Sequence, residues 1–398
     1  MLLIPFTLIF GQVVLQALAA DIGQASSFNI TPEVAQRYNC SETCQEAIQT
    51  GNEGDIGIFG TNFDFDFYET AANFTGSKPG DILKIQPVIP TNITVPAGVA
   101  VYKIQYTSAD IDGSPMPPFN LIAYAHGTSG VFRGCAPSTS PSLFDYQSWS
   151  PLLIAGYAVV ATDYAGLGNN YTAHKYHKLV QDSASGYLGG VAVAPVTKIY
   201  DALVAIDSLR NVTQTGGDDH DFLALGVIPS AVLGIKATFP DYDAPAISAK
   251  LKNRIDLAKV GQLCDNAISG LTVDLRLDAL SNRTAASDTR LKEFQELNAP
   301  AQGDRASKPL LLVLGEDDTI VSEESGAASF EETCAYGNPV HMSIYPGLDH
   351  SAVLTAATPE WLAFFQDRFA GKALGEGCSN ETKIPFDLEH AQRPLDSY

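Results

Sequence analysis

Two adjacent carboxylates and a histidine in the last quarter of the chain have the side-chain types and spacing for acid–base chemistry. Asp317 and Asp318 follow an aliphatic run at 310–314, and His350 follows the next predicted strand, at 341–345. An aliphatic run bounded by glycine predicts a strand buried on both faces, as in a parallel sheet. Such sheets place their functional side chains just past the carboxyl ends of the strands. A carboxylate that orients a histidine makes two thirds of a nucleophilic triad. The alternative interpretation is a surface aspartate near an unrelated loop histidine.

The elements that must position this pair alternate along the chain. Strand-like runs bounded by turn residues lie at 82–88, 99–106, 121–125, 157–162 and 186–196. Helical patterns lie at 149–155, 198–210, 247–260 and 274–285, and Thr358 followed by Pro359 predicts the cap and first turn of another helix. This alternation predicts an α/β protein with a mostly parallel sheet, in which the largely helical segment 197–308 is a cap inserted before the last core strands.

Three other segments carry weaker signals. Residues 21–81 are polar with little periodicity, so we expect helices and loops that wrap the core. The apolar segment 222–235 is interrupted by Gly226, Pro229 and Gly234 and cannot form one straight helix. The polar tail after Cys378 is expected to lie over the surface.

The N-terminus and the charge indicate where the protein works. Residues 1–20 are apolar, lack acids and bases and end in small residues, which predicts a signal peptide, with 21–398 as a single mature domain. No later stretch is long and apolar enough to span a membrane. The formal net charge of −21 excludes nucleic acid and anionic membrane surfaces as partners.

Sequons and cysteines support export to an oxidising compartment. Eight Asn-x-Ser/Thr sequons predict glycosylation at Asn29, Asn39, Asn73, Asn92, Asn170, Asn211, Asn282 and Asn380. The six cysteines, an even number, predict disulfides. Cys40 and Cys44 are close enough to pair locally, and the others are dispersed without zinc-site spacing. His174 and His177 lack a third ligand nearby, so no metal site is predicted.

Five motifs in order resemble a known family. They lie at 124–130 with 135–138, at 156–168, at 187–195, at 315–318 and at His350. Together they resemble the secreted lipase A-like lipases of fungi, which are α/β-hydrolases, over most of residues 80–370. The resemblance implies an α/β-hydrolase fold with a mostly parallel central sheet and a helical cap.

The resemblance also implies roles for individual residues. Asp318 would be the triad acid, preferred over Asp317 because the family pattern is Gly-x-x-Asp, and His350 would be the general base. Gly127 and Thr128 would form the oxyanion loop, while His126 packs or caps that loop. Cys135 would pair with Cys264, and Cys334 with Cys378. No cofactor is implied.

The nucleophile is missing from this pattern. No serine has glycine two residues before and two residues after it, as the Gly-x-Ser-x-Gly elbow requires. In the family, a helix, a strand, the elbow and a second helix lie between the segments that correspond to Gly168 and Tyr187. The join at 181–185 therefore indicates that about 50–60 residues are absent, the size of one strand–helix unit. A lost exon, a splice variant and an inactive paralogue all remain open explanations, and taken alone residues 157–195 are an ordinary βαβ unit.

Three functions follow. The resemblance implies a secreted serine hydrolase of carboxylic esters, acylglycerols above all, working as a monomer at a lipid–water interface, although the chain as written would be inactive. A non-catalytic secreted lipid-binding protein that uses the same cleft is the second possibility. The third is an esterase or peptidase of the same fold, because substrate class depends on the cap and pocket.

Overall fold

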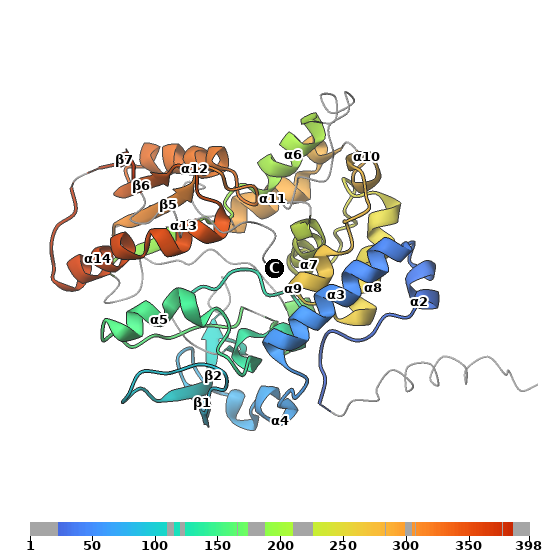
Figure 1. Ribbon diagram of the computed structural model, residues 1–398, viewed down its shortest axis with the longest axis horizontal. Coiled ribbons are helices and arrows are strands. Elements are labelled where there is room, and N and C mark those ends of the chain that lie inside the picture. The colour runs from blue at the N-terminus through green and yellow to red at the C-terminus, as the bar shows by residue number, and fades with distance from the viewer. Residues whose placement is uncertain are drawn as a thin grey trace, which may run out of the picture. The chain divides into compact units, whose positions relative to one another are not determined.

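The computed structural model describes residues 23–109, 115–119, 124–164, 166–173, 188–209, 226–282, 284–298, 305–306, 308–375 and 377–384 (Figure 1). The expected signal peptide, the join at 181–185, His174, His177 and Asn211 lie outside these residues. The chain divides into two compact units. The first comprises Met1–Phe144, Val160–His174 and Asn253–Asp274, and the second comprises Asp145–Val159, Lys175–Lys252 and Leu275–Tyr398.

A long helix organises the first unit. Helix α3 (Glu42–Phe59) runs for 18 residues from Ser41, whose hydroxyl accepts a hydrogen bond from the Cys44 amide and caps the helix. Its buried stripe consists of Cys44, Gln45, Ile48, Asn52, Asp55 and Phe59. The sequence showed little periodicity here because half of that stripe is polar. Helix α2 (Pro32–Arg37), helix α4 (Phe65–Tyr68) and helix α9 (Asp265–Ser269) complete the main helices of this unit.

An antiparallel sheet completes the first unit. Its strands are β1 (Ile82–Val88), β2 (Val101–Ala109) and β3 (Pro115–Phe119), in that order. The β1 bounds agree with the sequence prediction, and β2 is displaced toward the C-terminus from the predicted 99–106. Of the predicted strand 121–125, Tyr124 forms a parallel bridge with Ala161, which belongs to the predicted strand 157–162.

The second unit contains a parallel sheet in the order β4–β5–β6–β7. Its strands are β4 (Gly190–Val193), β5 (Leu310–Gly315), β6 (Val340–Tyr345) and β7 (Ser379–Thr382). The predicted strand 186–196 is thus shorter than expected, since Ala194 has a φ of 44° and Pro195 follows it. The aliphatic run at 310–314 and the strand-like run at 341–345 form the two central strands.

Alternate side chains of β5 bury into opposite faces of this sheet. Leu311 and Val313 pack with helices α13 (His350–Ala356) and α14 (Thr358–Phe369). Leu312 and Leu314 pack on the other face with α12 (Glu323–Ala335). Figure 1 shows α12 and α13 on opposite sides of this sheet. Each of these fully buried aliphatic side chains contributes about 1.5–3 kcal/mol. This two-sided burial fixes the strand end from which Asp318 follows.

Two predictions near the C-terminus were wrong. Thr358 is the first residue of α14 rather than its cap, because its hydroxyl donates to the Leu354 carbonyl of the preceding helix and Ala357 takes the cap position. The first part of the tail after Cys378 forms strand β7 rather than an irregular surface segment, and residues 385–398 lie outside the described part of the chain. The disulfide between Cys334 and Cys378 holds its start against β6, and the polar side chains of β7 remain exposed as suits an edge strand.

The described part of the segment between β4 and β5 is largely helical, as predicted. It contains α6 (Ile199–Leu209), α7 (Ile228–Thr238), α8 (Ala249–Gly261), α9, α10 (Leu277–Leu280) and α11 (Thr289–Asn298). Within 222–235, residues 228–235 lie in the buried helix α7, because Pro229 falls in its first turn and Gly234 is tolerated inside it. The predicted helix 274–285 shrinks to α10, since Ser281 pairs with Ile247 in an extended bridge.

Candidate active site

Asp318 is a buried carboxylate with every oxygen engaged. Its side chain is 1% exposed. One oxygen accepts the backbone N–H groups of Ile320, at 2.9 Å, and Val321, at 2.8 Å. The other oxygen lies 2.8 Å from Nδ1 of His350. These bonds satisfy a buried charge and fix the direction in which it accepts from the histidine.

His350 begins helix α13 and is held by its neighbours. The Asp349 side chain caps the helix by accepting from Ser351 N and Ala352 N. The His350 ring is 35% exposed, and among the described residues Asp318 is its hydrogen-bond partner. With Nδ1 committed to Asp318, Nε2 is the nitrogen that can exchange a proton with a reactant.

Gly315 allows the two strand ends to approach closely. A Cβ atom at this position would lie 2.4 Å from the Leu348 carbonyl oxygen and 3.1 Å from that of Asp349. The Asp317 amide donates to the same Leu348 carbonyl. The turn after β5, which carries Asp318, therefore lies directly against the turn that carries His350. Asp317, the rival acid in the sequence, is exposed.

The loop 127–130 in the first unit has exposed backbone between buried anchors. Gly127 and Thr128 are exposed, while His126 and Ser129 are buried. The His126 ring stacks on Tyr164 at a centroid distance of 4.2 Å, and the Tyr164 hydroxyl donates to the His126 carbonyl. These contacts give His126 the packing role that the sequence favoured.

The three expected disulfides are present. They join Cys40 to Cys44, Cys135 to Cys264 and Cys334 to Cys378. The second one fixes loop 127–130, because Gly130 pairs with Cys264 and a Cβ at Gly130 would lie 3.1 Å from the Cys135 sulfur. All seven sequon asparagines that the structure describes are exposed, as glycosylation requires.

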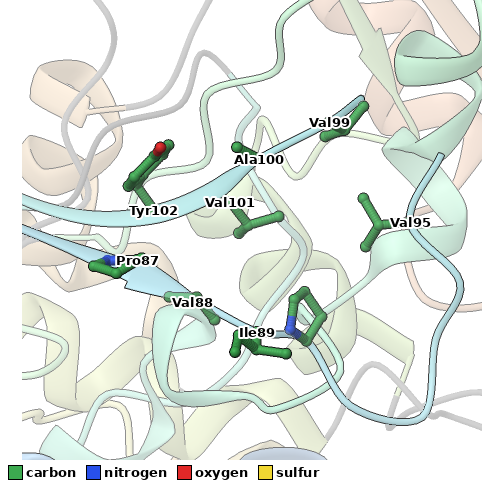
Figure 2. Close-up of a pocket in the computed structure, with 9 residues that line it drawn as sticks. Pro87, Val88, Ile89, Val95, Val99, Ala100, Val101 and Tyr102 are labelled. Carbon is green, nitrogen blue, oxygen red and sulfur yellow. The ribbon is translucent and has the colours of Figure 1, made fainter. Parts of the chain in front are cut away.

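An apolar pocket lies in the first unit beside the β1–β2 hairpin (Figure 2). Its volume is about 230 Å³, and it is lined by Pro87, Val88, Ile89, Pro90, Val95, Val99, Ala100, Val101 and Tyr102. In this hairpin polar side chains face inward and apolar side chains face outward, the reverse of the usual alternation. Lys84 and Gln105 donate to backbone carbonyls in and next to α4. Ile85 and Tyr102 are 61% and 53% exposed. No charged side chain lines this pocket.

Several structural residues of these units were not predicted from the sequence. Asp55 and Arg254 are buried ionisable residues with partners far away in the chain. The only sequence signal for Asp55 is its place on the buried stripe of α3. Among the described residues, no group of three or more metal-ligating side chains is found, and no helix is long and apolar enough to cross a membrane.

Comparison with known proteins finds fungal lipases that are similar to this chain. No protein-family model matches the chain. Lipase 10 and Lipase 6 of Candida albicans are 23% and 22% identical to it, and the matches cover 78% and 80% of this chain and 82% and 84% of the relatives. A crystal structure of Candida antarctica lipase A in its closed state superposes with a TM-score of 0.60 at 17% identity, covering 84% of this chain and 92% of that one. The chain is thus similar to fungal lipases. The structural likeness also confirms the α/β-hydrolase fold.

The matches leave part of each relative without a counterpart in this chain. The match to Lipase 10 extends over 382 positions, whereas 78% of the 398 residues is about 310, so about 70 positions in total have no residue of this chain. The match to Lipase 6 has 387 positions against 80% of the chain, about 318 residues, and leaves a similar total.

Proposed function

We propose that this lipase A-like protein hydrolyses carboxylic esters by a serine-hydrolase mechanism, with His350 as general base and Asp318 as its orienting acid. The observation that carries the proposal is the 2.8 Å contact between Asp318 Oδ2 and His350 Nδ1, made by a carboxylate whose other oxygen is held by two backbone amides. This contact selects the tautomer in which Nε2 is unprotonated and can accept a proton from a hydroxyl.

The nucleophile is proposed to belong to a segment that the natural protein has and this chain lacks. No Gly-x-Ser-x-Gly occurs in the sequence, and within the described residues no hydroxyl hydrogen-bonds to His350. The totals of about 70 unmatched positions against Lipase 10 and Lipase 6 support a lost segment over a lost residue. The 398-residue chain is therefore expected to form no acyl-enzyme.

Loop 127–130 is proposed to supply an oxyanion donor through the Thr128 N–H. The exposed backbone at Gly127 and Thr128, anchored on both sides by buried residues, suits a fixed donor that must not reorganise during reaction. The names of the relatives favour lipid esters such as acylglycerols as substrates. We propose that the protein takes these substrates as a monomer at a lipid–water interface. Exposed sequons and three disulfides support secretion.

An active-site probe tests this proposal directly. A fluorophosphonate should label a chain in which the strand–elbow segment has been restored between Gly168 and Tyr187, and His350→Ala should abolish that labelling. The 398-residue chain should remain unlabelled. Labelling of the 398-residue chain would show that another nucleophile acts here, and a restored chain that stays unlabelled while folded would contradict the proposal.

A second function is favoured by the missing elbow together with the uncharged pocket of the β1–β2 hairpin. The chain as given would then bind an acyl chain without turnover, since a cavity of about 230 Å³ lined only by apolar side chains suits an aliphatic ligand. A fluorescent fatty-acid analogue should bind, and Val101→Asp should weaken that binding. Equal binding by both proteins would exclude the hairpin pocket as the site.

A further inference from the structure

Helix α9 begins at a residue that cannot cap it. The cap position is Cys264, whose side chain is committed to the disulfide with Cys135 and makes no capping hydrogen bond. The first amides of a helix need acceptors when they are buried. At α9 the acceptor comes from another helix.

Asp55 of α3 supplies that acceptor from a buried position. Its carboxylate accepts from the Ala267 amide at 3.0 Å on one oxygen, and from the amide and side chain of Asn266, at 3.2 and 3.0 Å, on the other. Asp55 is 1% exposed. The two helices can come this close because Gly51 faces α9: a Cβ there would lie 2.5 Å from the Ala267 backbone.

The start of α9 is also what holds loop 127–130. The Asp265 amide donates to the Ser129 carbonyl at 3.3 Å, Cys264 pairs with Gly130, and the disulfide to Cys135 closes the same corner. A displacement of α9 must therefore be transmitted to this loop. The capping carboxylate of Asp55 is the contact that fixes α9 against the long helix of the unit.

We propose that Asp55 positions loop 127–130 by holding helix α9 against helix α3. We call this contact between α3 and α9 the latch, or the α3–α9 joint, and infer that Asp55 and Asp265 make it more stable in acid. The meaning of the latch for catalysis rests on the proposed function, in which this loop carries the oxyanion donor. The latch itself depends only on the contacts within the first unit.

The charges around the joint set the direction of its pH response. Burial raises the pKa of Asp55 to about 6, against the opposing effect of the amide hydrogen bonds. Burial, and then the charge of Asp55, raise the pKa of Asp265 to about 7. Both values lie above the ordinary 3.8, so the folded joint binds protons more tightly than the unfolded chain does. The contribution of Asp55 and Asp265 to the stability of the α3–α9 joint is present below about pH 4 and is lost as the pH rises through 6 and 7.

No cation among the described residues offsets this pair. The elements packed on α3 are α2, α9 and η2 (Arg133–Cys135). Helix α2 contributes Glu33 and Arg37, which are exposed, and α9 contributes only Asp265. From η2, Arg133 donates to the Asn169 carbonyl and lies over the Phe65 ring. On α3 itself, the acids Glu42, Glu46 and Glu53 are exposed.

Hydrogen exchange on the full 398-residue chain tests the latch without any need for a nucleophile. Protection of amides in 127–130 and 265–269, corrected for the intrinsic pH dependence of exchange, should fall about tenfold or more between pH 5 and pH 8, since each pKa unit is a factor of ten. Asp265→Asn should reduce this fall without removing it, because burial raises the pKa of Asp55 whether or not the second carboxylate is present. Asp55→Asn should lower protection at both pH values, because an amide offers one acceptor oxygen where two are used. The exposed Glu53→Gln is the matched control and should keep the wild-type profile.

Several outcomes would overturn the latch. The first is hydrogen-exchange protection of the wild type that does not change with pH. The second is an Asp265→Asn variant whose protection changes with pH as in the wild type. The third is a fall in protection between pH 5 and pH 8 that is as large in β5 as in 127–130 and 265–269. If Asp55→Asn does not fold, the Asp265→Asn comparison still decides. A flat profile would leave ester hydrolysis by His350 standing, and an unlabelled restored chain would leave the latch standing.

Discussion

A side chain at Gly315 would collide with the backbone of Leu348, at 2.4 Å from its carbonyl oxygen. This close approach brings the turn after β5 against the turn before α13, and so sets the separation of Asp318 and His350. The dyad thus depends on a residue that takes no part in its hydrogen bonds.

Gly315→Ala should separate the two turns and destabilise the second unit. Overpacking of a buried contact costs about 1–3 kcal/mol, which urea unfolding would measure. Gly375→Ala is the control, because a Cβ there meets open space, and its effect should stay within about 0.5 kcal/mol. Equal stability of the two variants would mean that the Leu348 turn gives way without cost.

Asp318→Ala should be costly for stability and for chemistry alike. It leaves the Ile320 and Val321 amides without their acceptor, at about 1–3 kcal/mol for each buried group. In a chain with the nucleophile segment restored, ester hydrolysis should fall roughly 10⁴-fold, because the histidine loses its orienting acid. Asp317→Ala is the neighbouring control and should change neither quantity appreciably, since its side chain is exposed. A larger loss with Asp317→Ala would reverse the assignment of the acid.

The parts of the fold that could be predicted are those with local signals. Strand β5 is an aliphatic run ended by glycine, and β6 is a weaker signal that follows it. The residues that follow parallel strands lie at one sheet edge, so the contact between Asp318 and His350 could be predicted from the sequence. The family resemblance selected Asp318 over Asp317, and burial of Asp318 against His350 agrees with that choice. The pairing of Cys135 with Cys264 also required the resemblance, because nothing local joins residues 129 apart.

The parts that could not be predicted depend on distant partners. Asp55 is stabilised by amides 211 and 212 residues away, and Arg254 by a carbonyl 215 residues away. Thr358 has the residue type of a cap, yet the Leu354 carbonyl provides a competing acceptor that only the preceding helix creates. Strand β7 is polar because it is an edge strand, and polarity alone made it look like a surface tail.

Removal of Arg254 should unfold the first unit readily. Its side chain is fully buried and donates to the carbonyls of Asn39 and Leu271 and to both oxygens of Asp274. Arg254→Met leaves the Asp274 charge unpaired in a partly buried site, at a cost of about 3–5 kcal/mol in urea unfolding. Arg254→Lys should recover only part of this loss, since a lysine cannot form the two-pronged contact. Full recovery by lysine would show that charge alone matters.

The same pair should make the unit sensitive to strong acid. Burial acts to raise the pKa of Asp274, but hydrogen bonds from Arg254 and Ser41 outweigh it and hold the pKa below the ordinary 3.8. Its contribution to stability is therefore present above about pH 4 and is lost as the pH falls through the folded-state pKa. Asp274→Asn should be less stable than the wild type at pH 7, and the difference should shrink below pH 4. A constant difference over this range would exclude Asp274 as the titrating group.

The disulfide between Cys135 and Cys264 should stabilise the protein more than the one between Cys40 and Cys44. The two bonds span 129 and 4 residues, and the chain-entropy model gives about 5 and about 2 kcal/mol for loops of these sizes. The double variant Cys135→Ser/Cys264→Ser should therefore lower the urea midpoint more than Cys40→Ser/Cys44→Ser does. It should also raise hydrogen exchange in loop 127–130, because Gly130 packs directly against this disulfide. Equal midpoints for the two variants would mean that the unfolded chain is already held compact near residues 135 and 264 by other contacts.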